Sequence, residues 1–275
     1  MLKQEDLRQA TLEQLNVVDG LPTLPDRFLK IKEKMEDRDS SLGSITKLIE
    51  SDQATSVTIM KIANSSFYNP VGKPVTSLSY AISRLGRKET GNIALSMSLL
   101  YGFSIPAGIT VIRRFWTHAF TAGQIARHLA VNGPYQDSVN PDTVFLASLL
   151  HDIGRAIIGI SIDPSYFEKE LAAFSDQELI DAERKEYGTD HAEVGSIILS
   201  KWEIPQDVCD IVANHHQTAT SKPSEICQIA DKLAHKYFLT TTSIEEVQLA
   251  LQDTLLDELL IQAFPVDEEE VETGN

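Results

Sequence analysis

The residues best suited to chemistry are His151 and Asp152, which directly follow the apolar run 145–150. Asn140 and Pro141 upstream resemble an N-cap followed by proline at the first helical position, so this run is predicted to be a buried helix. A buried carboxylate is costly unless a cation or strong donors meet it, and imidazole with carboxylate is a frequent ligand pair for divalent metals. The dipeptide therefore favours a metal site, although Asp152 could equally cap a helix beside a core histidine.

Other histidines also lie in or beside apolar segments. His118 shares its predicted helix face with Phe115, Ala122, Ile125 and Leu129. It should therefore point into the core, where a single histidine is more often structural than a ligand. His191 falls in the first turn of a predicted helix, where it could belong to the cap or face inward. His215 and His216 end another apolar helix; because successive residues differ in direction by about 100°, both reach one site only if the helix frays there, and solvent exposure is the alternative.

Asp231 is unusual because it lies in the middle of an apolar predicted helix, where aspartate has poor propensity and no backbone donor to cap. Its alternative role is a surface ion pair with Lys232 or Lys236. In chain order the candidate ligands are His118, His151, Asp152, His191, His215, His216 and Asp231, which leaves His128 and His235 outside the set. Seven nitrogen and oxygen donors suffice for one or two six-coordinate divalent ions with positions left for water and phosphate oxygens.

Helices must position these residues, since no segment alternates as a strand would and apolar residues recur at helical spacing throughout. Asp190 with Glu193 fits a capping box at the start of one such helix. Gly154 is expected to let the chain turn away after the His-Asp pair. The glycine- and proline-bearing segment 102–110 is the predicted boundary. We therefore predict an all-α chain with an N-terminal helical subdomain over residues 1–103, a C-terminal helical subdomain over 104–265 and an acidic, disordered tail over 266–275.

The composition of the chain limits the classes of binding partner that it can have. The chain has 275 residues, 42% of them hydrophobic, and a net charge of −16, which argues against nucleic-acid binding but not against a small phosphorylated ligand held by a metal. No uninterrupted apolar stretch approaches the roughly 18 residues of a membrane span. The polar N-terminus does not resemble a signal peptide, and two distant cysteines fit a reducing compartment. These features predict a cytoplasmic protein without membrane or nucleic-acid partners.

The seven-ligand order resembles that of the HD superfamily of metal-dependent phosphohydrolases. The chain as a whole resembles the HDOD family, whose members are relatives of the HD and HD-GYP domains. The matching segments are Leu21–Pro25, Leu48–Tyr68, Ser77–Gly86, Phe115–Ala119, Leu149–Gly154, Tyr187–Pro205, Ala213–Gln217 and Ile229–His235. The resemblance implies a bacterial, all-α signalling module in which an N-terminal helical bundle packs on a C-terminal HD-like bundle.

The same resemblance implies a division of the ligands. His118, His151, Asp152 and Asp231 would hold one metal, and Asp152 would bridge to a second held by His191, His215 and His216. The ions would be one or two of Fe, Mn, Mg, Ni or Zn.

Asp152 and Arg155 are the candidate catalytic residues. Arg155 stands where HD-GYP enzymes carry a lysine, and it could clamp a phosphate or simply be exposed. The chain lacks a glutamate after His216 and lacks a Gly-Tyr-Pro tripeptide. Cyclic di-GMP phosphodiesterase activity is therefore doubtful.

Three functional hypotheses follow. The favoured one is a signalling or regulatory protein that acts through a protein partner and keeps an HD-type metal site. The alternative is an active metal-dependent phosphohydrolase that hydrolyses a small phosphate ester or nucleotide with a metal-bound water as nucleophile. In the third, the protein senses a nucleotide at the metal without turning it over.

Overall fold

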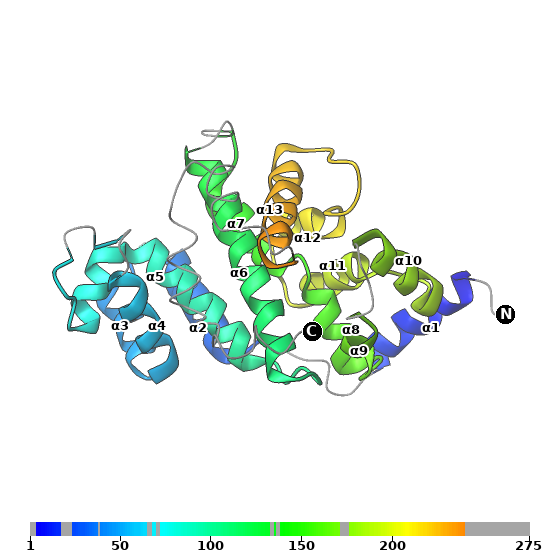
Figure 1. Cartoon of the computed structure of the whole chain (residues 1–275), viewed down its shortest axis with the longest axis horizontal. Coiled ribbons are helices and arrows are strands. Elements are labelled where there is room, and N and C mark those ends of the chain that lie inside the picture. Colours follow the sequence, from blue (N-terminus) through cyan, green and yellow to red (C-terminus); the bar gives the residue numbers. More distant parts are fainter. Residues whose placement is uncertain are drawn as a thin grey trace, which may run out of the picture. The chain divides into compact units, whose positions relative to one another are not determined.

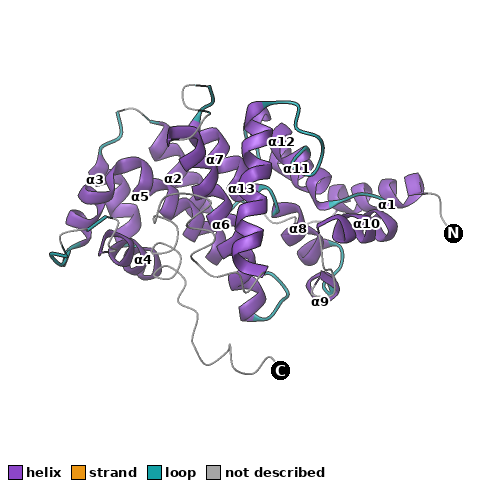
Figure 2. Cartoon of the chain, turned by 45° about the horizontal axis from the view of Figure 1, so that its top comes forward, coloured by secondary structure: helices purple, strands orange, loops and turns teal. Residues whose placement is uncertain are grey.

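Helices are the only regular secondary structure in the described part of the chain (Figures 1 and 2). The computed structural model describes residues 4–17, 24–37, 39–64, 68–69, 72–132, 135, 138–170 and 176–239. The prediction of an all-α chain is therefore confirmed. Backbone contacts divide the described residues into an N-terminal unit, which begins at Leu24 and ends at Gly102, and a C-terminal unit, which begins at Phe103 and also contains the first helix.

The N-terminal unit is a bundle arranged around its longest helix. Its helices are α2 (Asp26–Glu36), α3 (Leu42–Glu50), α4 (Gln53–Asn64) and α5 (Leu78–Gly102). The first three all pack against α5. α5 bends at Gly86, whose φ of 79° favours glycine. After the bend, the Arg87 guanidinium donates to the backbone carbonyl of Asp37 over 2.6 Å and so joins α5 to the end of α2.

The C-terminal unit contains every candidate metal ligand. Its helices are α1 (Gln4–Val17), α6 (Ile109–Asn132), α7 (Pro141–Leu150), α8 (Ile153–Ser161), α9 (Tyr166–Glu170), α10 (Asp176–Tyr187), α11 (His191–Lys201), α12 (Gln206–Ala213) and α13 (Lys222–Leu239). α6 packs against α7 and α13, while α11 packs against α8 and α12. The expected caps are present, since the side chains of Asn140 and Asp190 accept hydrogen bonds from the first turns of α7 and α11.

The stretch Pro141–Ser161 forms the centre of this unit. By length and composition alone it could cross a membrane, but 83% of its apolar window is buried. The helix is also interrupted at His151 and Asp152, where α7 gives way to α8. Its apolar character is therefore accounted for by core packing.

α1 belongs to the C-terminal unit, whereas the sequence-based division placed it in the N-terminal subdomain. Figures 1 and 2 both show α1 beside α10. The Thr11 hydroxyl donates to the carbonyl of Tyr187 over 2.8 Å, and Arg8 Nε donates to Glu193 over 3.0 Å. Gly188, with φ of 74°, lies so close to α1 that a Cβ there would be 2.3 Å from the Arg8 nitrogen. Helical periodicity predicts that α1 buries one face but does not say against which helix, and the predicted tail 266–275 lies outside the described residues.

α8 and α11 meet backbone to backbone at Gly154. A Cβ at this position would lie 1.9 Å from the carbonyl oxygen of His191 and 2.8 Å from the nitrogen of Gly195. Gly154 lies inside α8 and does not have a positive φ, so it serves close helix packing and not the turn that the sequence suggested. This contact sets Asp152, two residues earlier, beside the first residue of α11.

Replacement of Gly154 by alanine should therefore push α8 away from α11. Because the obstacle is backbone, we expect the free energy of unfolding to fall by about 3 kcal/mol. Thermal unfolding followed by circular dichroism measures the loss. The control is Gly43→Ala in α3, where a Cβ meets only the Ser41 hydroxyl at 3.6 Å; this change should be neutral or stabilising by up to about 1 kcal/mol. Equal melting temperatures for the wild type and Gly154→Ala would contradict the close contact.

Asp163 joins α8, α9 and α10. Its carboxylate accepts hydrogen bonds from the Ser165 backbone over 2.9 Å, from Lys169 Nζ over 2.6 Å and from the Tyr187 hydroxyl over 2.7 Å. Burial raises the pKa of Asp163, but the bonds from Lys169, Ser165 and Tyr187 outweigh it and hold the pKa below its usual value. Asp163 is therefore ionised in the folded protein at pH values where the unfolded chain binds a proton.

A depressed pKa contributes stability above the unfolded value of about 4, and this contribution is lost as pH falls toward the folded pKa. We therefore expect Asp163→Asn to cost about 1–2 kcal/mol near pH 6 and clearly less at pH 3.5. Urea unfolding of both proteins at the two pH values measures the difference. A cost that stays constant over this range would show that the charge of Asp163 does not stabilise the fold.

Candidate metal centre

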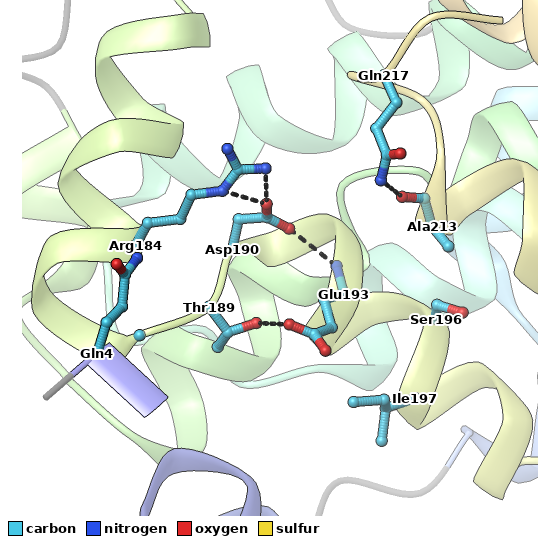
Figure 3. Close-up of a pocket in the computed structure, with 10 residues that line it drawn as sticks. Gln4, Arg184, Thr189, Asp190, Glu193, Ser196, Ile197, Ala213 and Gln217 are labelled. Atoms are coloured by element: carbon cyan, nitrogen blue, oxygen red, sulfur yellow. Dashed lines mark hydrogen bonds and ion pairs between the residues drawn. The ribbon is translucent and has the colours of Figure 1, made fainter. Parts of the chain in front are cut away.

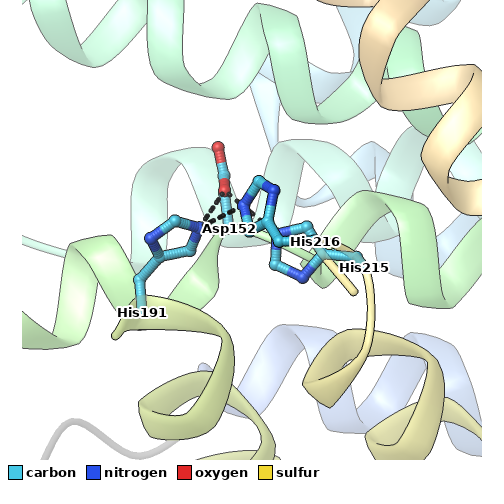
Figure 4. Close-up of side chains that lie close together, drawn as sticks. All are labelled: Asp152, His191, His215 and His216. Atoms are coloured by element: carbon cyan, nitrogen blue, oxygen red, sulfur yellow. Dashed lines mark hydrogen bonds and ion pairs between the residues drawn. The ribbon is translucent and has the colours of Figure 1, made fainter. Parts of the chain in front are cut away.

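The seven predicted ligands converge in the C-terminal unit although they come from five separate places in the chain. We call His118, His151, Asp152 and Asp231 the first cluster, and Asp152, His191, His215 and His216 the second cluster. In the second cluster, one donor atom from each residue lies within 4.8 Å of all the others (Figure 4). The same holds for His118, His151 and Asp152 in the first. Asp152, at the junction of α7 and α8, belongs to both.

Donor atoms in the first cluster are spaced like the ligands of one metal ion. Nε2 of His118 lies 3.1 Å from Nε2 of His151. Oδ1 of Asp231 lies 3.2 Å and 3.4 Å from these two nitrogens. Ligands that are each about 2.1 Å from one ion lie about 3.0 Å apart in octahedral geometry and about 3.4 Å apart in tetrahedral geometry. Oδ2 of Asp152 is slightly farther, at 3.8 Å from His118 and 3.6 Å from His151.

The second cluster has the same spacing around the other oxygen of Asp152. Nε2 of His191 lies 2.9 Å from Nε2 of His216 and 3.3 Å from Oδ1 of Asp152. Nε2 of His215 lies 3.8 Å from the same oxygen. Because Oδ2 faces the first cluster and Oδ1 the second, the carboxylate of Asp152 has the orientation of a bridging ligand.

Hydrogen bonds outside the clusters fix which ring nitrogen faces inward. His151 and His215 each donate from Nδ1 to the backbone carbonyl three residues earlier, over 2.7 Å and 2.6 Å. A carbonyl only accepts, so the proton is on Nδ1 and the Nε2 of a neutral ring presents its lone pair to the cluster. This is the tautomer that metal-binding histidines adopt.

For His191 the outer nitrogen is held by Glu183, a residue that the sequence analysis missed. It is 1% exposed, and its Oε2 accepts from Nδ1 of His191 over 2.8 Å and from the His191 backbone over 2.9 Å. The Tyr166 hydroxyl donates to its other oxygen. The available signal was a charged residue on the apolar face of α10, which Glu183 shares with Leu179 and Ile180.

The carboxylates draw protons to two of the histidines. Burial lowers the pKa of His151, but Asp152 and Asp231 outweigh it and raise the pKa to about 9. Burial likewise lowers the pKa of His191, and Glu183 with Asp152 raises it to about 10. Two positions that face buried carboxylates thus attract positive charge, which a proton or a metal ion can supply.

The surroundings of the other two histidines of the second cluster favour the neutral ring. Burial lowers the pKa of His215 and, more strongly, that of His216, to about 2. Nε2 of His215 is buried and has no hydrogen-bond partner in the described residues. A buried nitrogen lone pair without a donor is costly, and a divalent cation would satisfy it. The donor set therefore fits a metal ion.

These positions decide between the interpretations left open by the sequence. Asp152 occupies the N-cap position of α8 but makes no side-chain capping bond, so capping is not its role. Asp231 is 5% exposed and faces two histidines of the first cluster, so its carboxylate lies in the interior and not at the surface. α12 ends at Ala213, and the turn that follows directs both His215 and His216 inward.

Arg155 is not an exposed arginine. Its side chain is 11% exposed, and Nη1 donates to Oδ2 of Asp152 over 2.6 Å. Burial alone would raise the pKa of Asp152, but the guanidinium of Arg155 and the neighbouring histidines hold it well below its usual range. Arg155 therefore orients the shared carboxylate and keeps it ionised, while its contact with a phosphate remains a prediction.

A polar pocket of about 370 Å³ is lined by residues that adjoin the second cluster in the chain, among them Asp190 and Gln217 (Figure 3). Asp190 accepts from Arg184 over 2.7 Å. Glu193, in the same pocket, accepts from the Thr189 hydroxyl. The residues that line this pocket include no histidine, and both carboxylates are paired with other side chains, so the pocket wall does not resemble the two clusters.

Comparison with known proteins identifies the family. The model of the HDOD domain matches residues 21–218 of the chain. An uncharacterized protein of Treponema pallidum (strain Nichols) is 25% identical over 203 residues, which are 72% of this chain and 38% of that protein. The chain thus spans well under half the length of this curated relative.

Solved structures share the fold. The crystal structure of an HDOD domain protein with unknown function from Geobacter sulfurreducens has a TM-score of 0.66 at 23% identity and covers 95% of this chain and 89% of its own. A "Putative metal-dependent phosphohydrolase" from Shewanella amazonensis SB2B has a TM-score of 0.58 at 22% identity. The match covers 98% of this chain and 94% of that one. A "Putative signal transduction protein" from Marinobacter aquaeolei VT8 has a TM-score of 0.63 at 19% identity. The match covers 95% of this chain and 66% of that one.

The Glu183 carboxylate should raise metal affinity through His191. In Glu183→Gln the negative charge behind the ring is lost, and we expect affinity for Zn²⁺ to fall by about 10- to 100-fold. Isothermal titration calorimetry measures this. Glu178→Gln is the matched control, because it makes the same chemical change on the exposed face of α10. Unchanged affinity in Glu183→Gln would mean that Glu183 serves folding alone.

Proposed function

Because the chain belongs to the HDOD family, we propose that it is a signalling protein whose C-terminal unit binds two divalent metal ions, one in each cluster. The observation that carries this proposal is the set of buried Nε2 atoms, whose spacing and hydrogen-bonded tautomers suit metal ligation. Five histidines and two carboxylates are ligands that favour Fe, Zn or Ni over Mg, which prefers oxygen alone. The name of the Marinobacter relative supports a signalling role, which we propose is exerted through a protein partner.

A second candidate is a metal-dependent phosphohydrolase. The observation that favours it is the bridging orientation of Asp152, whose two oxygens each face one cluster. Two-metal hydrolases use such a pair of ions, about 3.5–4 Å apart, to polarise a phosphoryl group and to make water nucleophilic near neutral pH. The name of the Shewanella relative is consistent with this candidate.

In that reaction, residues of this chain would hold the metal ligands in position. Arg155 holds the Asp152 carboxylate ionised between the clusters, and Glu183 fixes the ring of His191. The first cluster has four protein ligands and the second also has four, so each six-coordinate ion would keep two positions for water and phosphate oxygens. A small phosphate ester or nucleotide is the substrate class that such a site accommodates.

Metal content tests the main proposal. Protein purified without chelators or metal-affinity resin should carry two equivalents of divalent metal per chain, measured by plasma mass spectrometry. Asp152→Ala should lose most of both, because it removes the shared ligand. Asp210→Ala, an exposed position on α12, should retain them. Wild-type protein that stays metal-free after dialysis against Mn, Fe and Zn would refute the metal centre and with it the hydrolase.

Phosphate release separates the two candidates. If the protein is a phosphohydrolase, the metal-loaded wild type should hydrolyse p-nitrophenyl phosphate or mononucleotides, and Asp152→Ala should lose this activity while keeping its helical circular dichroism spectrum. Metal-loaded protein that releases no phosphate from a panel of esters and nucleotides would leave the signalling role standing alone.

A further inference from the structure

His235 lies beside the first cluster although nothing in the ligand order of the sequence includes it. It is four residues after Asp231 on α13, and residues at this spacing lie on the same helix face one turn apart. Asp231 is buried and His235 is half-buried. α13 therefore directs both side chains toward the helix that carries His118.

Its ring is placed where a ligand could be. One ring nitrogen of His235 lies within 4.8 Å of donor atoms of both His118 and Asp231. The rings of His118 and His235 meet edge to face, with centroids 5.7 Å apart and planes at 89°. Ligands on opposite sides of one octahedral ion are about 4.2 Å apart, so these three atoms can share an ion after a small side-chain rotation.

The alternative is that His235 only packs against His118. The contrast with His128 weighs against this. His128 is also half-buried and lies on the same helix as His118. In the described residues, however, it belongs to no cluster of three or more histidine, cysteine or carboxylate side chains that could hold a metal ion. His235 is distinguished by lying within 4.8 Å of a carboxylate and a second imidazole, both of which already belong to the first cluster.

We propose that His235 is an additional metal ligand that completes the coordination of the ion in the first cluster. This inference rests on the proposed metal centre. With His235, the first ion has five protein ligands and one remaining position, whereas the second ion has four and keeps two. The two sites are then unequal: the first ion is bound more tightly and is largely structural, and the second is the exchangeable ion that is open to an external ligand.

Titration of metal-free protein with Co²⁺ tests this. The wild type should show two binding steps of different affinity by calorimetry. His235→Ala should weaken the tighter step by at least about tenfold, since losing a ligand should cost no less than losing an outer hydrogen-bond partner, and leave the weaker step unchanged. The visible spectrum of the first equivalent should also change, because the absorption of Co²⁺ depends on its coordination number.

His128→Ala is the matched control and should bind both equivalents as the wild type does. His235→Asn keeps a polar side chain of similar size, so it separates ligation from packing: the metal-free protein should melt like the wild type but gain less stability on adding Co²⁺. Unchanged affinities and spectra in both His235 variants would overturn the role of His235 while leaving the metal centre intact. Failure of the wild type to bind Co²⁺ would overturn both.

Discussion

The stability of the C-terminal unit depends on positive charge that offsets its buried imidazole lone pairs and carboxylates. Nε2 atoms approach each other to 3.1 Å in one cluster and 2.9 Å in the other, and Asp152 and Asp231 lie among them with little access to water. Such a concentration of acceptors is unfavourable unless positive charge enters it. The nearby carboxylates raise the pKa of His151 and that of His191, so a proton on either ring can supply part of that charge, and two divalent ions would supply it in full.

The surrounding helices fix the positions of the candidate ligands. Gly154 and Gly195 let α8 and α11 approach closely enough that Asp152 meets His191. Glu183 and two backbone carbonyls hold the outer nitrogens of His191, His151 and His215, so the inner nitrogens are directed before any ion binds. Preorganised ligands lose little entropy on binding, which favours affinity. A hydrolase and a metal-stabilised signalling module would both use this arrangement.

The sequence predicted much of the centre because its signals were local. The apolar run before His151 and the apolar faces around His118 and Asp231 predicted that these side chains point inward. The resemblance to the HDOD family supplied the division of the ligands into two metal sites. Glu183 and the packing of α1 escaped because they depend on which helices meet, which periodicity does not specify. Arg155 could not be placed either, since its burial follows from its bond to Asp152 and from the α8–α11 contact.

The most direct test is a crystal of the protein soaked in Mn²⁺, with diffraction data collected to give anomalous differences. Two peaks should appear about 3.5–4 Å apart on either side of the Asp152 carboxylate, one beside His118 and the other beside His191. A single peak, or none between these side chains at saturating Mn²⁺, would contradict a two-metal centre.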